Sequence, residues 1–129
     1  MAKKKITLKY PLNCVSKSIL WNAISTPTGL QTWLAGKVTD EENILTFEWS
    51  RDEVRQAEII RKRNNAYIRF HWLDDEDPDS YFELRMDYNE LTGDYTLTVS
   101  DIVEDDEEEE MVDLWNIEVE SLLRQYSMN

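Results

Sequence analysis

A chain of 129 residues can bury one hydrophobic core, so we expect a single domain over residues 1–129. The formal charge of −13 opposes nucleic-acid binding, which needs a basic face to neutralise phosphates. The single cysteine, Cys14, excludes an internal disulfide and favours a reducing cytoplasm. Because no apolar stretch approaches the roughly 20 residues that cross a bilayer, membrane insertion is not expected.

The chain begins with a predicted strand and two predicted short helices. Residues 6–10 alternate apolar and polar side chains, which is typical of a strand with one buried face, and Pro11 is expected to end it. Ser16 can cap the next helix, which Pro27 is expected to stop. A second short helix is predicted over residues 29–34.

Five further strands are predicted, because apolar residues then recur at every second position. These strands lie at residues 45–49, 54–61, 68–72, 82–86 and 95–99. The adjacent Ile59 and Ile60 break the alternation and indicate a bulge. Asn64-Asn65 predicts a tight hairpin turn, since Asn tolerates positive φ.

The last segment returns to helical spacing. Its apolar residues recur every three or four positions and predict a long amphipathic helix with one face on the core: Val112, Trp115, Val119, Leu122 and Tyr126. Seven consecutive acids, residues 104–110, precede this stripe, where the helix dipole favours negative charge. The predicted fold class is α+β, with a curved antiparallel sheet of six to seven strands wrapped around the long C-terminal helix.

No catalytic, metal or cofactor site is expected. The one histidine, His71, is predicted to point to the wet face of its strand, because Phe70 and Trp72 point to the core. No second Cys or His can complete a zinc site, and residues 74–79 lack the central glycine and bidentate glutamate of a calcium loop. The three glycines form no phosphate-binding loop. The sequence therefore predicts a protein that is not an enzyme.

Two patterns point to binding. Large apolar side chains on the strands and the last helix could wall a ligand cavity or fill a closed core: Phe47, Trp49, Phe70, Trp72, Phe82, Leu84, Trp115 and Val119. The acidic run could be a docking patch for a basic protein partner or a solvated helix start. The residues of that patch would be Glu107, Glu108, Glu109 and Glu110.

One segment resembles a family signature. Residues 20–27, with the sequence LWNAISTP, are followed by Leu30 and Trp33-Leu34. This pattern resembles "V-W-x-A-hydrophobic-T-x-P … L-x-x-W" of the START-like (SRPBCC) superfamily, and especially its subfamily related to activators of heat-shock-protein ATPases. The resemblance implies the helix-grip fold, with a cavity between sheet and helix that often holds apolar molecules. Some family members are instead co-chaperones, or enzymes that act on cyclic or aromatic substrates.

The sequence departs from the family pattern around the expected cavity entrance. The loop after Trp33 is short, Glu-Glu-Asn replaces a glycine before Leu45, and the acidic run precedes the last helix. Each change shortens or charges the entrance. The first hypothesis is a non-catalytic domain that binds a small apolar ligand, the second a protein-interaction or co-chaperone-like module that uses the acidic run, and the third an enzyme.

Overall fold

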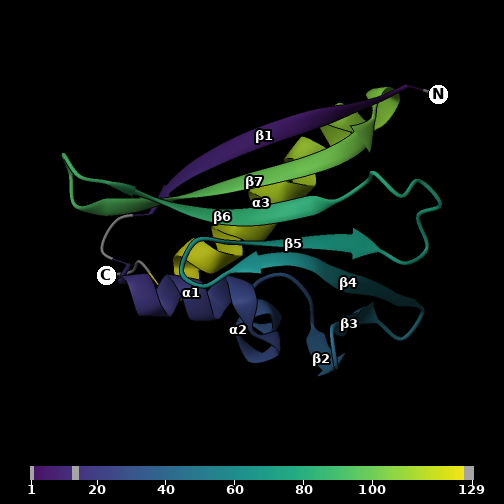
Figure 1. The fold of residues 1–129 in the computed structure, drawn as a ribbon, viewed down its shortest axis with the longest axis horizontal. Helices are drawn as coiled ribbons and strands as arrows, with labels where there is room; N and C mark the ends of the chain where they lie inside the picture. The colour runs from purple at the N-terminus through teal and green to yellow at the C-terminus, as the bar shows by residue number, and fades with distance from the viewer. Residues whose placement is uncertain (1, 13–14, 127–129) are drawn as a thin grey trace.

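The computed structural model describes residues 2–12 and 15–126, in which seven strands form one antiparallel sheet with the helices on one face (Figure 1). In chain order the elements are β1 (Lys3–Leu12), α1 (Lys17–Ser25), α2 (Pro27–Gln31), β2 (Lys37–Glu41), β3 (Ile44–Ser50), β4 (Glu53–Arg63), β5 (Tyr67–Trp72), β6 (Phe82–Asn89), β7 (Asp94–Glu104), the 3₁₀ turn η1 (Asp105–Glu107) and α3 (Glu108–Tyr126). The order across the sheet is β1-β7-β6-β5-β4-β3-β2. The predicted α+β helix-grip fold is confirmed. Cys14 lies outside the described residues.

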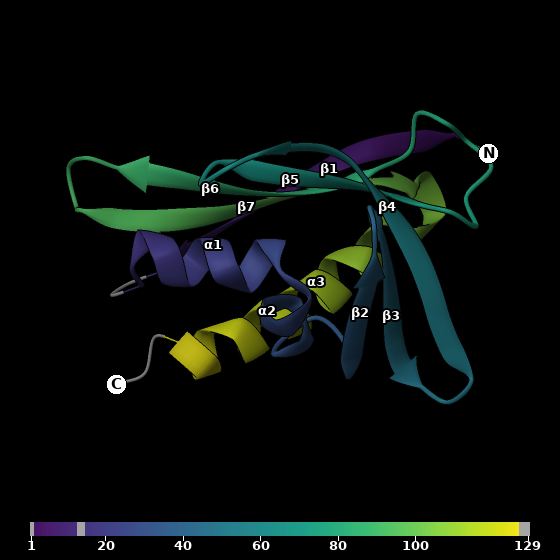
Figure 2. The ribbon, with the colours of Figure 1, turned by 60° about the horizontal axis from the view of Figure 1, so that its bottom comes forward.

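The sheet bends into a trough that holds the long helix. Figure 2 shows β2 and β3 turned steeply away from β1, β5, β6 and β7, with α3 crossing the concave side. The predicted bulge is present on β4, where the ladder with β5 shifts register between Ile59 and Arg61. A bulge twists and bends its strand, so these residues contribute to the curvature.

The two edges of the sheet differ from the sequence prediction. β1 pairs with β7 along its whole length, from Lys3 opposite Glu104 to Leu12 opposite Tyr95. Pro11 lies inside β1, so the predicted strand end was wrong. An edge strand tolerates proline because one of its sides makes no ladder hydrogen bonds. The other edge, β2, has no predicted counterpart, since Val38 is the one buried residue among its five.

The two short helices share one capping residue. Ser16 caps α1 as predicted, with its hydroxyl accepting from the Ile19 N–H at 3.3 Å. Thr26 ends α1 and also caps α2, because its hydroxyl accepts from the Gly29 N–H at 2.9 Å. Pro27 therefore begins α2, which starts and ends earlier than the predicted 29–34.

One face of α3 packs into the trough. Trp115, Val119 and Leu122 are buried and Val112 is partly buried, as the spacing predicted. The side chain of Tyr126 lies outside the described part of the chain. Among the described residues, no helix combines the length and the apolar content that crossing a bilayer requires.

Candidate ligand-binding site

A cleft of about 220 Å³ lies between the N-terminal half of α3 and the concave face of the sheet. Four aromatic side chains from four elements form its wall: Trp49 of β3, Trp72 of β5, Phe82 of β6 and Trp115 of α3. The aliphatic part of the lining consists of Leu34, Met111 and Leu114. Four charged residues complete it: Glu53, Arg55, Asp101 and Glu118. The cleft therefore combines a large aromatic surface with ionisable groups.

The aromatic wall is one connected row of rings. The ring centroids of Trp49 and Trp72 are 6.1 Å apart, those of Trp72 and Phe82 5.1 Å, and those of Phe82 and Trp115 5.8 Å. Each of these spacings falls within the range of favourable aromatic pairs. The Trp49 indole N–H also donates to the Leu34 carbonyl at 2.8 Å, which fixes that ring. The wall is thus held in place by contacts within the protein.

The structure divides the eight predicted cavity residues into two groups. Trp49, Trp72, Phe82 and Trp115 line the cleft. The other four are fully buried in the packed core behind it: Phe47, Phe70, Leu84 and Val119. Phe47 contacts the rings of both Trp49 and Trp72, at 5.9 and 5.4 Å. The second group supports the wall and does not border the open space.

Asp101 is a buried carboxylate on the inner face of β7. Its side chain shares that face with Leu97, Val99 and Val103, and the residue is only 7% exposed. The Trp115 indole N–H donates to its Oδ2 at 2.9 Å. Burial raises the pKa of Asp101 to about 6, although this bond, the Ile102 N–H and the nearby Arg55 charge oppose the rise. Extending the alternation of residues 95–99 by two positions would have revealed an acid at a core position.

Glu118 occupies a similar position on α3. It lies three residues after Trp115 and four before Leu122, so it belongs to the helix face that the apolar stripe defines. Burial raises its pKa to about 7. Among the described residues, no hydrogen bond or ion pair to its carboxylate is found. In the sequence, Glu118 is an acid within the apolar face of the helix, and the spacing of apolar residues alone does not reveal it.

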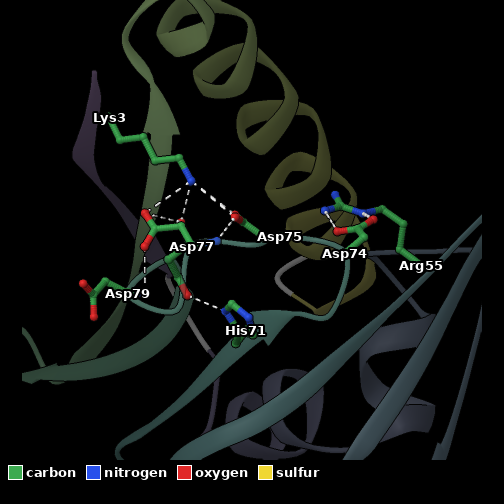
Figure 3. Close-up of polar contacts among 8 residues, drawn as sticks. Lys3, Arg55, His71, Asp74, Asp75, Asp77 and Asp79 are labelled. Atoms are coloured by element: carbon green, nitrogen blue, oxygen red, sulfur yellow. Dashed lines mark hydrogen bonds and ion pairs between the residues drawn. The ribbon is translucent and has the colours of Figure 1, made fainter. Parts of the chain in front are cut away.

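Arg55 is the cation of the cleft, and the structure holds it on two sides. Its guanidinium lies 4.0 Å from the centroid of the Trp72 ring. Its Nε and Nη2 donate to the two carboxylate oxygens of Asp74 at 2.9 and 2.8 Å (Figure 3). These bonds hold the pKa of Asp74 below its usual value. The charge of Arg55 is therefore largely compensated by Asp74.

The acidic loop between β5 and β6 is fixed by the N-terminal strand. The Lys3 ammonium donates to Ser80 at 2.9 Å and forms ion pairs with Asp75 and Asp77 at 3.3 and 3.5 Å (Figure 3). His71 contacts the same loop, with its Nδ1 2.8 Å from the Ser80 carbonyl oxygen. His71 is not part of the cleft lining. Its contact is with the loop backbone, and the residue is half-buried.

The acidic run begins at the end of β7 and continues into α3. Glu107, Glu109 and Glu110 are exposed, while Glu108 is half-buried and pairs with Lys4 at 2.9 Å. Residues 107–110 therefore present three exposed carboxylates and one surface ion pair. No group of three or more His, Cys, Asp or Glu side chains within residues 2–12 and 15–126 has a geometry suited to a metal ion.

A larger hollow of about 360 Å³ lies elsewhere, over β2, β3 and β4. Its lining is mainly polar and acidic, with Ile44 and Leu73 as the large apolar side chains, and it contains no aromatic ring. Ligand sites are lined mostly by apolar and aromatic side chains with a few placed polar groups. The smaller cleft against α3 fits that description and the larger hollow does not.

A model of the START-like superfamily domain matches residues 1–127. The chain belongs to the START-like superfamily. This confirms the resemblance seen in residues 20–34, and the match extends far beyond that segment. A search of curated proteins finds no match.

Solved structures agree with the START-like assignment. The solution structure of BfR322 from Bacteroides fragilis is 50% identical, covers 100% of this chain and 96% of that one, and has a TM-score of 0.69. The Aha1 dimer from Colwellia psychrerythraea has a TM-score of 0.79 at 11% identity and 97% coverage of both chains. XoxI from Bacillus cereus has a TM-score of 0.73 at 12% identity, covering 98% of this chain and 96% of that one. At such low identity the last two likenesses show a shared fold alone.

Proposed function

We propose that this START-like domain binds one small, flat apolar molecule in the cleft against α3, without catalysing a reaction. The aromatic wall carries the proposal. Trp49 and Trp72 are only half-buried, whereas Phe47 and Phe70 behind them are fully buried. A ligand that covers large apolar rings at an open cleft removes them from water, and this burial favours binding.

The volume of the cleft limits the size of the ligand. About 220 Å³ is below the roughly 300–1,000 Å³ of sites for drug-sized molecules. It exceeds the roughly 150 Å³ of an engineered cavity that accepts benzene. These limits favour a ligand of one or two fused rings.

The composition of the lining supports binding rather than catalysis. The residues that line the cleft include no serine, cysteine, histidine or lysine, so a hydroxyl, thiol or amine nucleophile with a histidine base is absent from this lining. The enzyme hypothesis would have to use Asp101 and Glu118 as an acid–base pair, whereas we propose that they position a ligand. We further propose that residues 1–129 act as one cytoplasmic domain, which the match over residues 1–127 and the single cysteine support.

Nuclear magnetic resonance of the five tryptophan indole N–H groups tests the proposal. Titration with 3-methylindole, a neutral two-ring probe, should shift the indole signals of Trp49 and Trp115. The signal of Trp33 should stay in place, because its N–H donates to the Ala23 carbonyl at 2.8 Å outside the cleft. Tryptophan-to-phenylalanine variants assign the signals. Unchanged Trp49 and Trp115 signals at saturating probe would overturn the proposal.

A blocking variant sharpens this test. Leu114→Trp should fill the cleft from its rim without disturbing the core, because Leu114 is 46% exposed. The matched control is Ile117→Trp on the same helix, where the side chain is 62% exposed and does not line the cleft. Probe binding should be lost in the first variant and kept in the second.

The exposed acids Glu107, Glu109 and Glu110 support docking of a basic protein as a second candidate function. Its test is binding of a lysine-rich peptide at physiological salt. Binding should be lost when Glu107–Glu110 are all replaced by Gln. Binding should be kept in Glu120→Gln, which removes an acid from the C-terminal half of α3. Equal binding by both variants would remove this candidate.

A further inference from the structure

We propose that the ligand of the cleft carries a positively charged group, such as a protonated amine, on its flat apolar body. This inference rests on the proposed binding function and specifies its ligand class. It follows from which charges face the cleft, which of them are already compensated, and what they border.

The charges that face the cleft are mostly negative. Glu53 and Arg55 come from β4, Asp101 from β7 and Glu118 from α3. The one cation among them, Arg55, is already engaged by Asp74 through two hydrogen bonds. Three carboxylates therefore border the cleft against one cation, and Asp74 shares the charge of that cation.

Apart from Arg55, the surroundings of Asp101 add little positive charge. Asp101 also borders a second hollow of about 190 Å³, whose lining adds Glu104 and Glu107. The Lys3 ammonium in that lining is held by Asp75 and by Asp77 of the acidic loop. The second hollow therefore adds to the negative potential.

The aromatic wall favours the same kind of ligand. A cation placed over the face of an indole ring is attracted by the negative charge of that face. Trp72 already holds the Arg55 guanidinium in this way, with 4.0 Å between the cation and the ring centroid. Trp49 and Trp115 offer two more indoles to the same cleft. A cationic amine can thus contact rings and carboxylates together. A neutral ligand can only donate hydrogen bonds to the carboxylates, without the charge attraction, and an anion is repelled.

Burial makes the two inner carboxylates sensitive to such a ligand. In the unliganded protein the raised pKa values of Asp101 and Glu118 reflect the cost of a charge with little solvent around it. A bound cation stabilises the ionised forms, so binding should release protons. Cation affinity should therefore increase from pH 5 to pH 8, as these two groups become ionised.

Three probes of similar shape and different charge test the inference: tryptamine (cationic), tryptophol (neutral) and indole-3-acetate (anionic). Affinities at pH 8 are read from the indole signals of Trp49 and Trp115. Tryptamine should bind roughly three- to tenfold more tightly than tryptophol, and indole-3-acetate should bind most weakly. Glu118→Gln should reduce the preference for tryptamine. The control Glu120→Gln removes the same charge from an exposed position, paired with Arg124 at 3.7 Å, and should preserve the preference.

The outcomes separate this inference from the proposed function. Equal binding of tryptamine and tryptophol, with no effect of Glu118→Gln, would overturn the cationic ligand while the cleft remains a binding site. An equal loss of preference in the Glu118 and Glu120 variants would also overturn it, because general charge attraction would then explain the selectivity. If 3-methylindole, tryptamine, tryptophol and indole-3-acetate all fail to bind, the proposed binding function itself is wrong.

Discussion

Trp115→Phe should destabilise the protein by an amount that depends on pH, because the lost indole N–H donates to an ionisable group. Asp101 receives that bond at 2.9 Å and is 7% exposed. Its pKa is about 6 in the folded protein against 3.8 for the ordinary carboxyl, so folding favours the protonated form. The contribution of Asp101 to stability is therefore lost as pH rises from about 4 through 6, and above this window Asp101 is an anion that needs its donor.

The structure sets the size of the effect. A hydrogen bond to a charged group contributes about 1.5–3 kcal/mol, and one to a neutral group about 1 kcal/mol. The smaller phenyl ring also lowers the free energy of unfolding, by the same amount at every pH. We therefore expect Trp115→Phe to lower the free energy of unfolding by about 1–2 kcal/mol more at pH 8 than at pH 4.5.

Urea denaturation at the two pH values measures this difference. The matched control is Trp33→Phe. Trp33 is 3% exposed and its indole N–H donates at 2.8 Å to the backbone carbonyl of Ala23, which does not titrate. The control should lose the same free energy of unfolding at both pH values. If Trp115→Phe behaves like the control, then Asp101 is not an anion that depends on Trp115, and the electrostatic account of the cleft fails.

Three further changes test other parts of the structure by denaturant or thermal unfolding. Gly29→Ala should cost about 1–3 kcal/mol or more, because the added Cβ would lie 2.0 Å from the Asn22 carbonyl oxygen; a stability equal to wild type would show that α1 and α2 can separate freely. Glu118→Gln should stabilise the unliganded protein by about 1 kcal/mol at pH 8, after allowance for the partial exposure of Glu118. The variant should have the stability of the wild type at pH 4, because the raised pKa of Glu118 destabilises the folded protein only above about pH 4.5, where the carboxyl of the unfolded chain ionises. Replacing Glu107–Glu110 with Gln should leave the protein folded, because the ion pair of Glu108 with Lys4 is exposed and the change also removes repulsion among the acids. Unfolding would mean a larger structural role for the run.

The sequence predicted the fold where local spacing and global packing agree. Apolar residues recur at every second position on β3, β5 and β6 and at helical spacing on α3. Each pattern arises because one face of the element is buried, so it can be read from the local sequence. β2 had too few apolar residues to show a period. The start of α2 depends on Thr26 acting as a cap for two helices at once, which no single-helix pattern represents.

The cleft was only partly predictable, because it depends on how far the sheet bends. Alternation places Phe47 and Trp49 on the same face of β3, but only the curvature decides that the first is buried and the second lines open space. Asp101 and Glu118 were missed for a different reason. Each interrupts an apolar pattern, and at the sequence level such an interruption is easily taken as the end of the pattern rather than as a polar group in a buried place.

The pairing of β1 with β7 has a kinetic consequence. The first strand of the chain has its ladder partner about 90 residues later, since Leu12 opposes Tyr95 and Lys3 opposes Glu104. Contacts so distant in sequence slow folding, because a long loop must close before the contacts form. During synthesis β1 emerges before β7 and stays unpaired until β7 has been made, with the apolar side chain of Ile6 uncovered. The sheet is therefore completed late, because β1 remains unpaired until β7 is available.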